Sequence, residues 1–466
     1  MLIRKAKYFL NKKPRTTFFV LFGCVCVSGS LLFFSLKKSY TIPMSYEKGA
    51  VITSQTKEDG KEDTGNVSLP VEHLETPNAV KTIYMTQCVV GTPSFRQDLV
   101  DLVNETELNS IIIDVKDFSG GIGFKTDNPK LKNFVSDNCR APDIKEFVEY
   151  LHSQNIYAIA RITVFQDPLY TSTYPKDAVK KASDGTVWKD YKKISFVDVG
   201  ATDFWDYIIE LSKEAYGVGF DELNFDYVRF PSDGPMKDIY FPYSNGREKA
   251  DALEEFFVYL SKTLKDPKTY HSQRVLEEFK KQGFAIEGSN LSNNLVPKIS
   301  ADLFGMTTTN TDDLWIGQVL ERTLPYFDYV APMVYPSHYP YGFNGWGNPN
   351  NYPYEIIEFC MAQAVKRAVS NTTTVDGFAT EPIYETKEVF SNGATTTEQV
   401  FSGLYSKEVY SKLKLRPWLQ DFDYGGDYDV DEVRAQIQAT YDAGLNSWML
   451  WAPSNRYTRG ALNSSD

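Results

Sequence analysis

The chain has 466 residues, a formal net charge of −12 and a sequence pI of about 5.1. This acidity excludes nucleic-acid binding through a basic surface, which needs concentrated lysine and arginine. Aromatic residues make up 14% of the chain and include 30 tyrosines and 7 tryptophans. Aromatic planes stack on the C–H faces of sugar rings, and they also fill large cores, so this composition suits a carbohydrate-active protein or an ordinary large domain.

The N-terminal 36 residues have the pattern of a membrane-targeting segment. Residues 16–36 contain no charge and are long enough to cross a bilayer as a helix. The basic segment 1–15 precedes them, which predicts a cytoplasmic N-terminus. We expect an uncleaved signal anchor at 16–36, with a cleaved signal peptide as the alternative. Residues 37–78 are polar and aperiodic, which predicts a disordered stalk that carries an extracellular domain at 79–462.

The cysteines and histidines predict no metal site and no cofactor. Cys24 and Cys26 lie in the predicted anchor, which leaves Cys88, Cys139 and Cys360 and allows at most one disulfide among them. The chain has no CxxC motif, and its four histidines are scattered. The acidic run at 427–431 imitates the start of a calcium loop, but its later positions do not match, so we interpret it as a solvated turn.

Eight β-rich runs alternate with helical patterns along the rest of the chain. Strands are expected at 81–90, 110–115, 156–164, 222–230, 298–303, 329–335, 414–420 and 447–451. Helices are expected at 94–108, 141–153, 202–216, 247–263, 270–281, 313–323, 353–369 and 430–443. This alternation predicts parallel βαβ units, and eight of them predict an α/β fold of the closed (β/α)8 TIM-barrel type. The insertions at 231–297 and 370–410 are expected to overhang the barrel mouth.

Carboxylates and aromatic residues gather where the predicted strands end. In a TIM barrel those ends form the active site, and a pair of carboxyl groups there can hydrolyse a glycosidic bond. The candidate catalytic residues are Asp226, Asp302 and Asp421. The candidate substrate-binding residues are Asp114, Lys116, Arg161, Tyr227, Arg229, Tyr335, His338, Trp418, Gln420, Trp448 and Trp451.

Several of these residues also have structural interpretations. Asp226 could cap the following loop, and Arg229 could fasten that loop through a salt bridge. Asp302 could orient other groups rather than act as an acid. The pair Asp114 and Lys116, and likewise Trp448 and Trp451, are expected to share a strand face. The first pair could then form an ion pair, and the tryptophans could fill the barrel interior.

Four motifs carry a resemblance to a known family. They are GFDELNFDYVRFP at 219–231, ISADLFG at 299–305, YVAPMVYPSHY at 329–339 and RPWLQDF at 416–422. Over about 80–460 the chain resembles a bacterial family of glycoside hydrolase domains of unknown specificity, similar to (β/α)8 hydrolases of the alpha-amylase and melibiase type. The resemblance implies a retaining mechanism with Asp226 as nucleophile and an acid on a later strand. Asp302 is the nearest match, although amylase-like enzymes carry glutamate there, and Asp421 is the second candidate.

Other carbohydrate-active barrels fit less well. A chitinase-like DGxDxDxE pattern, with Asp221 and Asp226 at its first and third acids, places Val228 where the essential glutamate belongs. A deacetylase would need a histidine-rich metal site, and only His338 lies near a strand end. We therefore expect a membrane-anchored extracellular glycoside hydrolase with a carbohydrate substrate and no obligate protein partner. The alternative is a non-catalytic carbohydrate-binding or envelope-structural protein on the same barrel.

Overall fold

The computed structural model describes residues 71–288, 291–292, 294–391 and 394–465. The predicted cytoplasmic segment 1–15, the anchor at 16–36 and most of the predicted stalk lie outside these residues. Across the described ranges, no helix is both long enough and apolar enough to span a bilayer.

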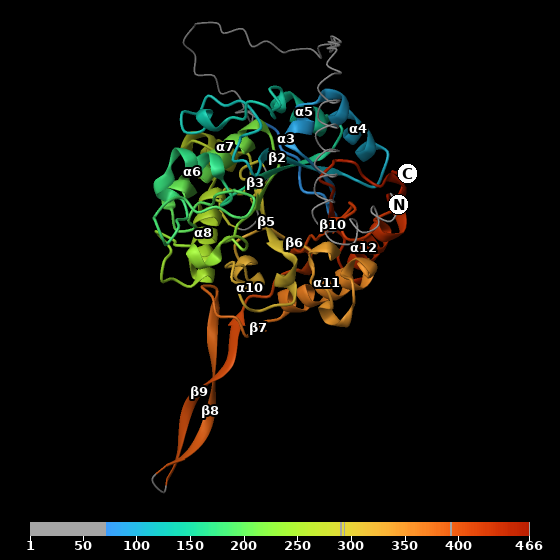
Figure 1. Ribbon diagram of the computed structural model, residues 1–466. Helices are drawn as coiled ribbons and strands as arrows, with labels where there is room; N and C mark the ends of the chain where they lie inside the picture. Colours follow the sequence, from blue (N-terminus) through green and yellow to red (C-terminus); the bar gives the residue numbers. More distant parts are fainter. Residues whose placement is uncertain (1–70, 289–290, 293, 392–393, 466) are drawn as a thin grey trace, which may run out of the picture. The chain divides into compact units, whose positions relative to one another are not determined.

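The centre of the fold is a closed barrel of parallel strands, surrounded by helices (Figure 1). The strands are β1 (Lys81–Met85), β2 (Ser110–Lys116), β3 (Tyr157–Thr163), β4 (Glu222–Asp226), β5 (Lys298–Phe304), β6 (Tyr329–Met333), β10 (Trp418–Gln420) and β11 (Trp448–Trp451). Each barrel strand pairs with the next barrel strand along the chain, so that β6 pairs with β10. The last strand, β11, closes the barrel on β1, with Leu450 opposite Ile83. The TIM-barrel architecture predicted from the alternating pattern is confirmed.

The helices cover the outside of the barrel because each has one apolar face. In α5 (Ile144–Ser153) the buried residues Ile144, Phe147, Val148 and Leu151 follow the predicted helical spacing. The other helices are α3 (Gln87–Val90), α4 (Pro93–Asn104), α6 (Pro168–Thr173), α7 (Thr202–Val218), α8 (Lys249–Leu264), α9 (Gln273–Lys281), α10 (Leu320–Thr323), α11 (Pro353–Val369) and α12 (Val430–Asp442). The apolar faces of most of these helices and the outward faces of the strands form one continuous core, whereas Leu276 and Phe279 of α9 belong to a separate small cluster.

The first and fourth strands end well before the predicted residue, each for a local reason. The first was expected to reach residue 90, but the side chain of Thr86 accepts a hydrogen bond from the backbone N–H of Val89 and starts α3. The fourth was expected to reach residue 230. It ends at Asp226 because Tyr227 adopts a left-handed conformation with φ of 51°, which cannot continue a strand.

The segment 370–410 is a long antiparallel hairpin rather than a loop over the mouth. It comprises β7 (Thr372–Thr373), β8 (Thr380–Ser391) and β9 (Ala394–Lys407) and projects from the barrel in Figure 1. The hairpin follows α11 rather than a strand, and Lys407 Nζ donates to the carbonyl of Ala368 in the last turn of α11 at 3.1 Å. It therefore belongs to a helix-to-strand connection, so the predicted location was wrong.

The ordered domain starts before the predicted boundary at residue 79. The backbone N–H of Leu74 donates to Asp221 Oδ1 at 2.7 Å, and that of His73 donates to Asn294 Oδ1 at 3.0 Å. Asp221 directly precedes β4, so residues 71–78 contact the amino-terminal end of the barrel. At the other terminus the chain stays in contact beyond residue 462, because Ser464 forms a β-bridge with Thr106.

A disulfide joins Cys88 of α3 to Cys139, which lies in the connection between β2 and α5. Cys360 is a buried free thiol in α11. Among the three cysteines in the described part of the chain, the structure thus forms the single disulfide that the sequence allows.

Candidate active site

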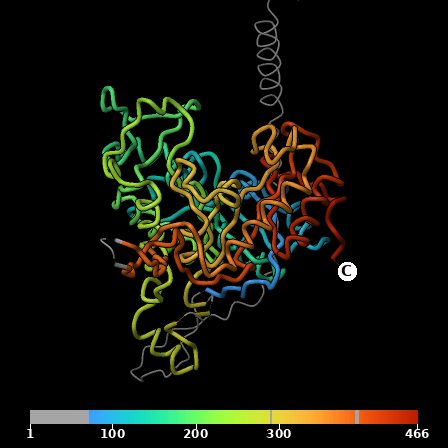
Figure 2. Tube along the Cα trace, turned by 90° about the horizontal axis from the view of Figure 1, so that it is seen from below, coloured from blue at the N-terminus to red at the C-terminus, as the bar shows by residue number. Residues whose placement is uncertain are grey.

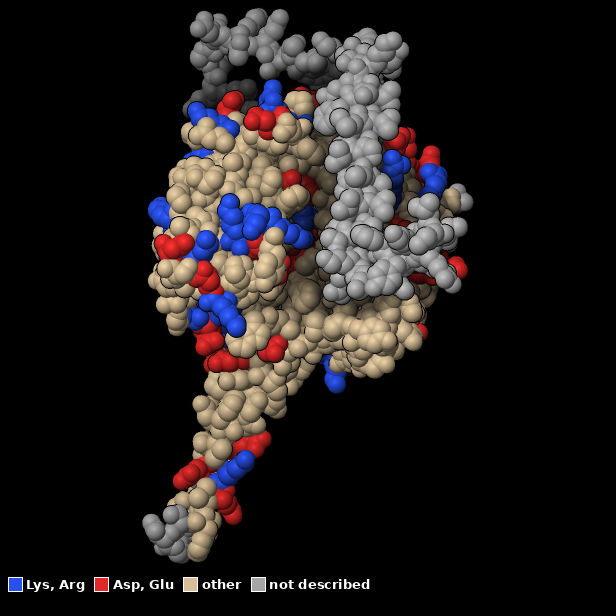
Figure 3. Space-filling model, in the orientation of Figure 1, with Lys and Arg blue, Asp and Glu red and all other residues tan. Residues whose placement is uncertain are grey.

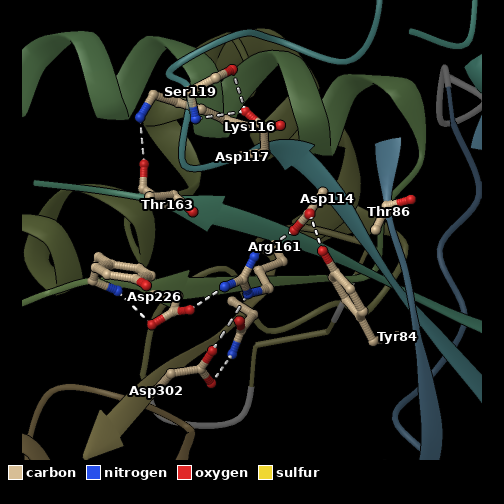
Figure 4. Close-up of polar contacts among 12 residues, drawn as sticks. Tyr84, Thr86, Asp114, Lys116, Asp117, Ser119, Arg161, Thr163, Asp226 and Asp302 are labelled. Atoms are coloured by element: carbon tan, nitrogen blue, oxygen red, sulfur yellow. Dashed lines mark hydrogen bonds and ion pairs between the residues drawn. The ribbon is translucent and has the colours of Figure 1, made fainter. Parts of the chain in front are cut away.

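Arg161 of β3 lies at the centre of a charged cluster inside the carboxyl end of the barrel (Figure 4). Its Nη1 donates to Asp114 Oδ1 of β2 at 2.5 Å, and its Nη2 donates to Asp226 Oδ2 of β4. Its Nε lies 3.8 Å from Asp302 Oδ2 of β5. Strand register produces the cluster, because Arg161 is paired with Asp114 on one side and with Asn224 on the other. One guanidinium group therefore contacts carboxylates from three other strands.

Asp226 is held by a backbone turn as well as by Arg161. The N–H of Tyr227 donates to Asp226 Oδ1 at 2.5 Å, and Tyr227 is the residue with positive φ. A left-handed conformation costs a bulky residue about 1–3 kcal/mol and is sustained only by its surroundings. The capping contact considered in the sequence is thus present, but it leaves Asp226 lining the cavity.

Asp302 has an asymmetric set of contacts. Its Oδ1 accepts hydrogen bonds from Asn224 Nδ2 and Trp418 Nε1, both at 2.9 Å. Its Oδ2 accepts no hydrogen bond from the described residues, and its nearest cationic group there is Arg161 Nε at 3.8 Å. Burial, and then the negative charge of Asp226, raise the pKa of Asp302 to about 8. A proton on this carboxyl group therefore belongs on Oδ2, from which it can be donated.

Asp114 lies behind Arg161 and supports it. The hydroxyl group of Tyr84 donates to Asp114 Oδ2, and burial raises the pKa of Asp114 to about 6. The ring of Tyr84 stacks on Trp451 with centroids 4.0 Å apart, and the Arg161 guanidinium lies 5.1 Å from the centroid of Trp451. These contacts help to hold the guanidinium group in place.

A cavity of about 390 Å³ opens over these groups. It is lined by the predicted site residues Arg161, Asp226, Tyr227, Arg229, Asp302, Tyr335, His338, Trp418 and Trp451. It is also lined by Ser232, Phe304, Leu314, Ile316 and Met333, which the sequence did not single out. Leu314 reaches the cavity from a loop in which it and Trp315 both have positive φ, and no sequence pattern marks such a conformation in residues of this type.

Two pairs of residues that were expected to share a strand face do not share one. A register irregularity between Asp114 and Lys116 turns Lys116 out of the barrel, where its Nζ lies 2.9 Å from Asp167 Oδ2 and donates to the Thr163 carbonyl (Figure 4). Asp114 and Lys116 therefore do not pair. Trp448 and Trp451 are three residues apart and point to opposite faces.

The outward-facing tryptophan, Trp448, is buried in the core between the barrel and its helices, and its Nε1 donates to Tyr441 OH of α12 at 3.0 Å. The inward-facing one, Trp451, lines the cavity. Trp448 is thus a core residue in this structure.

Two further candidates lie beside the cavity rather than in its lining. Asp421 accepts hydrogen bonds from the Thr458 backbone N–H at 2.9 Å and from the Thr458 hydroxyl group at 2.7 Å, and it ties the C-terminal segment to the end of β10. Gln420 Oε1 accepts from the Ser337 N–H at 3.1 Å and so positions the turn that carries His338.

Of the histidines in the described part of the chain, His338 lies apart from the others. His338 lines the cavity, whereas His73 and His152 flank Asp221 at the opposite end of the barrel. Within the described ranges, no group of three or more His, Cys, Asp or Glu side chains could hold a metal ion.

The chain matches the family model described as "Putative glycosyl hydrolase domain" over residues 82–379 and 377–457. No curated protein matches the chain. A hypothetical protein from Ruminiclostridium thermocellum is 34% identical over 39% of this chain and 92% of its own, with a TM-score of 0.36.

Two more distant structures are also similar. The PgaB (BpsB) glycoside hydrolase domain from Bordetella bronchiseptica is 12% identical over 83% of this chain and 99% of its own, with a TM-score of 0.47. An alpha-galactosidase from Thermus thermophilus is 9% identical over 82% of this chain and 63% of its own, with a TM-score of 0.40. The family model covers most of the chain and confirms the resemblance found in the sequence motifs. The chain therefore belongs to this glycosyl hydrolase family, and it is a glycoside hydrolase.

Proposed function

We propose that this protein is a membrane-anchored extracellular glycoside hydrolase that cleaves a polysaccharide or cell-envelope glycan with retention of configuration, with Asp226 as nucleophile and Asp302 as acid/base. One observation carries the assignment. Asp226 and Asp302 line the same cavity and contact the same guanidinium group, yet they differ in their other contacts. Two carboxyl groups in different environments are what glycoside hydrolysis requires.

The first step uses both groups. Asp226 attacks the anomeric carbon as the carboxylate, while Asp302 transfers the proton on Oδ2 to the glycosidic oxygen. The C–O bond to the leaving sugar breaks as the ester bond to Asp226 forms. Asp302 Oδ1 accepts hydrogen bonds from Trp418 and Asn224. Because Oδ1 is occupied in this way, Oδ2 is the atom that carries the proton.

The second step reverses the roles. Asp302, now a carboxylate, takes a proton from water, and the resulting hydroxide attacks the anomeric carbon and displaces Asp226. The Arg161 guanidinium donates to Asp226 in the resting state and stays beside it when the carboxylate is released again. Trp451 and Tyr335 line the cavity and offer aromatic faces to a sugar ring.

The proposed extracellular location rests on the sequence of residues 16–36 and on one disulfide bond. The uncharged run at 16–36 has the length and flanking charges of a signal anchor. The Cys88–Cys139 disulfide supports an oxidising compartment, because such bonds persist mainly outside the cytosol.

A glycan panel tests the proposal. Polysaccharides and cell-envelope glycans are incubated with the wild-type protein, and reducing ends are measured. We expect release from at least one glycan, and a loss of about 10³-fold or more in Asp226→Asn, which keeps its shape but cannot form the ester. Asp421→Asn is the matched control, because the same chemical change falls outside the cavity lining. Equal losses in both variants, or an Asp226→Asn protein that no longer folds, would contradict the nucleophile role.

A further inference from the structure

Positive charge gathers at the mouth of a protein that is acidic overall. The chain has 49 lysines and arginines against 61 aspartates and glutamates. Figure 3 nevertheless shows lysine and arginine side chains clustered near the centre of the face on which the barrel opens. Two basic residues can be located near the cavity from their contacts, and they are Arg229 and Lys192.

Arg229 brings an uncompensated guanidinium group into the cavity lining. Its Nη1 donates to the Phe230 carbonyl at 3.0 Å and to Ser232 Oγ at 3.1 Å. Its guanidinium carbon lies 5.0 Å from the centroid of the Tyr227 ring. No described carboxylate forms an ion pair with it, in contrast to Arg161, which has three carboxylate neighbours. Neutral partners therefore hold Arg229 in place and leave its remaining N–H groups for a ligand.

Lys192 approaches the same mouth from a different loop. It lies in a turn at 190–193 that is closed by a hydrogen bond from the Ile194 N–H to Asp190 Oδ1 at 2.8 Å. Lys192 is exposed, has no ion-pair partner among the described residues, and follows Tyr191, which is 73% exposed. Burial, and then the charge of Lys192, lower the pKa of His338, which lines the cavity. Trp188 Nε1 of the same loop donates to the Pro235 carbonyl at 3.3 Å, so the loop that carries Lys192 packs against the loop that follows Arg229.

Binding of a neutral sugar would leave these charges without a counter-charge while displacing water from them. Removing solvent from an unpaired cation is unfavourable, whereas an incoming anion compensates it. A guanidinium group matches the two oxygens of a carboxylate or phosphate with parallel hydrogen bonds. An exposed lysine at the rim speeds the approach of an anionic polymer.

We propose that the substrate is an anionic glycan, in which a carboxylate or phosphate group near the scissile bond binds Arg229 and the flanking charges are attracted by Lys192. This inference rests on the proposed hydrolase function and names its substrate class. The anionic group could belong to a uronic acid or to a phosphate-bearing glycan. Separate arms of one experiment distinguish these two sources.

The test measures binding to the Asp226→Asn protein, which does not depend on turnover. The carboxylate probes are polygalacturonate and alginate, and the phosphate probe is a glycerol-phosphate teichoic acid. Dextran and carboxyl-reduced polygalacturonate are the neutral probes. We expect binding to at least one acidic polymer, no comparable binding to the neutral polymers, and a steep loss of affinity as salt is raised.

Variants of the two cations sharpen the result. Adding Arg229→Gln is expected to weaken binding of the acidic polymer about tenfold or more, because a charge-assisted hydrogen-bond pair is lost. Lys192→Gln, on an exposed turn that keeps the fold intact, should weaken it less and reduce its salt dependence. Lys145→Gln on α5 is the matched control, since it removes the same charge from an exposed site outside the cavity.

The outcomes separate this inference from the proposed function. Binding to no acidic polymer, or neutral polymers bound as tightly and unaffected by Arg229→Gln, would overturn the anionic-substrate proposal. Wild-type cleavage of neutral glycans alone would overturn it while leaving the hydrolase proposal standing. Charge-dependent binding without product release from any glycan would support the ligand class and contradict the proposed hydrolysis.

Discussion

Two aspartates on neighbouring strands meet one arginine and acquire different properties from their remaining contacts. Asp226 and Asp302 have 4% and 1% of their surfaces exposed, so burial alone does not distinguish them. Asp226 accepts hydrogen bonds from the Tyr227 N–H and from Arg161 Nη2, whereas the closest Arg161 nitrogen to Asp302 is Nε, at 3.8 Å from Oδ2. This difference is the basis of our proposal that Asp226 is the nucleophile and Asp302 the proton donor.

Replacing Asp302 by asparagine removes the proposed proton donor. Substrates with poor leaving groups depend on that proton, so we expect Asp302→Asn to slow them by about 10²- to 10⁴-fold. Aryl glycosides with acidic phenols leave without protonation, and their first step should slow far less. Steady-state and burst kinetics on the two substrate classes check this expectation. A uniform loss on both would remove Asp302 as the acid.

The raised pKa of Asp302 also predicts a pH dependence. The protonated form is needed for the first step, so kcat/KM should fall as pH rises through about 8. The unfolding free energy should also fall as pH rises, because the folded state keeps on Asp302 a proton that the unfolded chain releases near pH 4. The unfolding free energy of the wild type should therefore fall relative to Asp302→Asn between about pH 4 and 8, by more than about 1 kcal/mol.

Denaturant titrations of both proteins at pH 5 and pH 8 measure the difference. A pH-independent difference between wild type and Asp302→Asn would show that this carboxyl group is ionised throughout the range and would contradict its assignment as the acid.

The sequence predicted both aspartates because strand ends can be counted along the chain. It named Arg161 and Arg229 as candidate site residues but did not show which of them contacts Asp226. The choice depends on register, which sets Arg161 of β3 between Asp114 and Asn224. The sequence also gave no sign of the irregularity that turns Lys116 outward, because one displaced residue leaves the hydrophobic pattern nearly unchanged.

At the level of elements, the alternating pattern predicted the barrel strands and the main helices but not the hairpin β8–β9. Barrel strands are buried on both faces and appear in the sequence as apolar runs. Most side chains of the hairpin whose burial is described are exposed on both faces, so neither face carries an apolar period that a sequence can reveal. Its polar, threonine-rich sequence therefore indicated a loop.

The Cys88–Cys139 disulfide links α3 to the segment that leads into α5. It closes a loop with a sequence separation of 51 residues, for which the chain-entropy model gives about 4 kcal/mol. Replacing both cysteines by serine should lower the unfolding free energy by about 2–4 kcal/mol and leave kcat nearly unchanged, because neither residue lines the cavity. Chemical denaturation with and without reductant measures this. The double variant should not respond to reductant, and equal stability of the oxidised and reduced wild type would contradict the prediction.

At the level of the whole molecule, the chain just before the barrel is part of the fold. Asp221 Oδ1 accepts the Leu74 N–H, whereas its Oδ2 accepts the Ala158 N–H and lies 3.0 Å from His152 Nε2. The predicted boundary at residue 79 removes the first of these donors. The sequence could not show this contact, because residues 71–78 lack periodicity and dock by backbone hydrogen bonds.

Two truncated proteins test where the domain begins. The protein that starts at residue 71 should be soluble and as active as the longer chain. The protein that starts at residue 79 leaves a buried acceptor without its donor, which should lower the unfolding free energy by about 1–3 kcal/mol. Thermal and denaturant unfolding of the pair provide the comparison, and indistinguishable curves would place the boundary where the sequence predicted it.

The central claim, that Asp226 forms a covalent bond to the sugar and Asp302 assists, is tested most directly by intact-protein and peptide mass spectrometry of Asp302→Asn. The variant is mixed with an aryl glycoside of whichever sugar the glycan panel identifies. Because the base that activates water is missing, the ester should accumulate, and the added sugar mass should map to Asp226. An adduct on another residue, or no adduct together with a product of inverted configuration, would contradict the account.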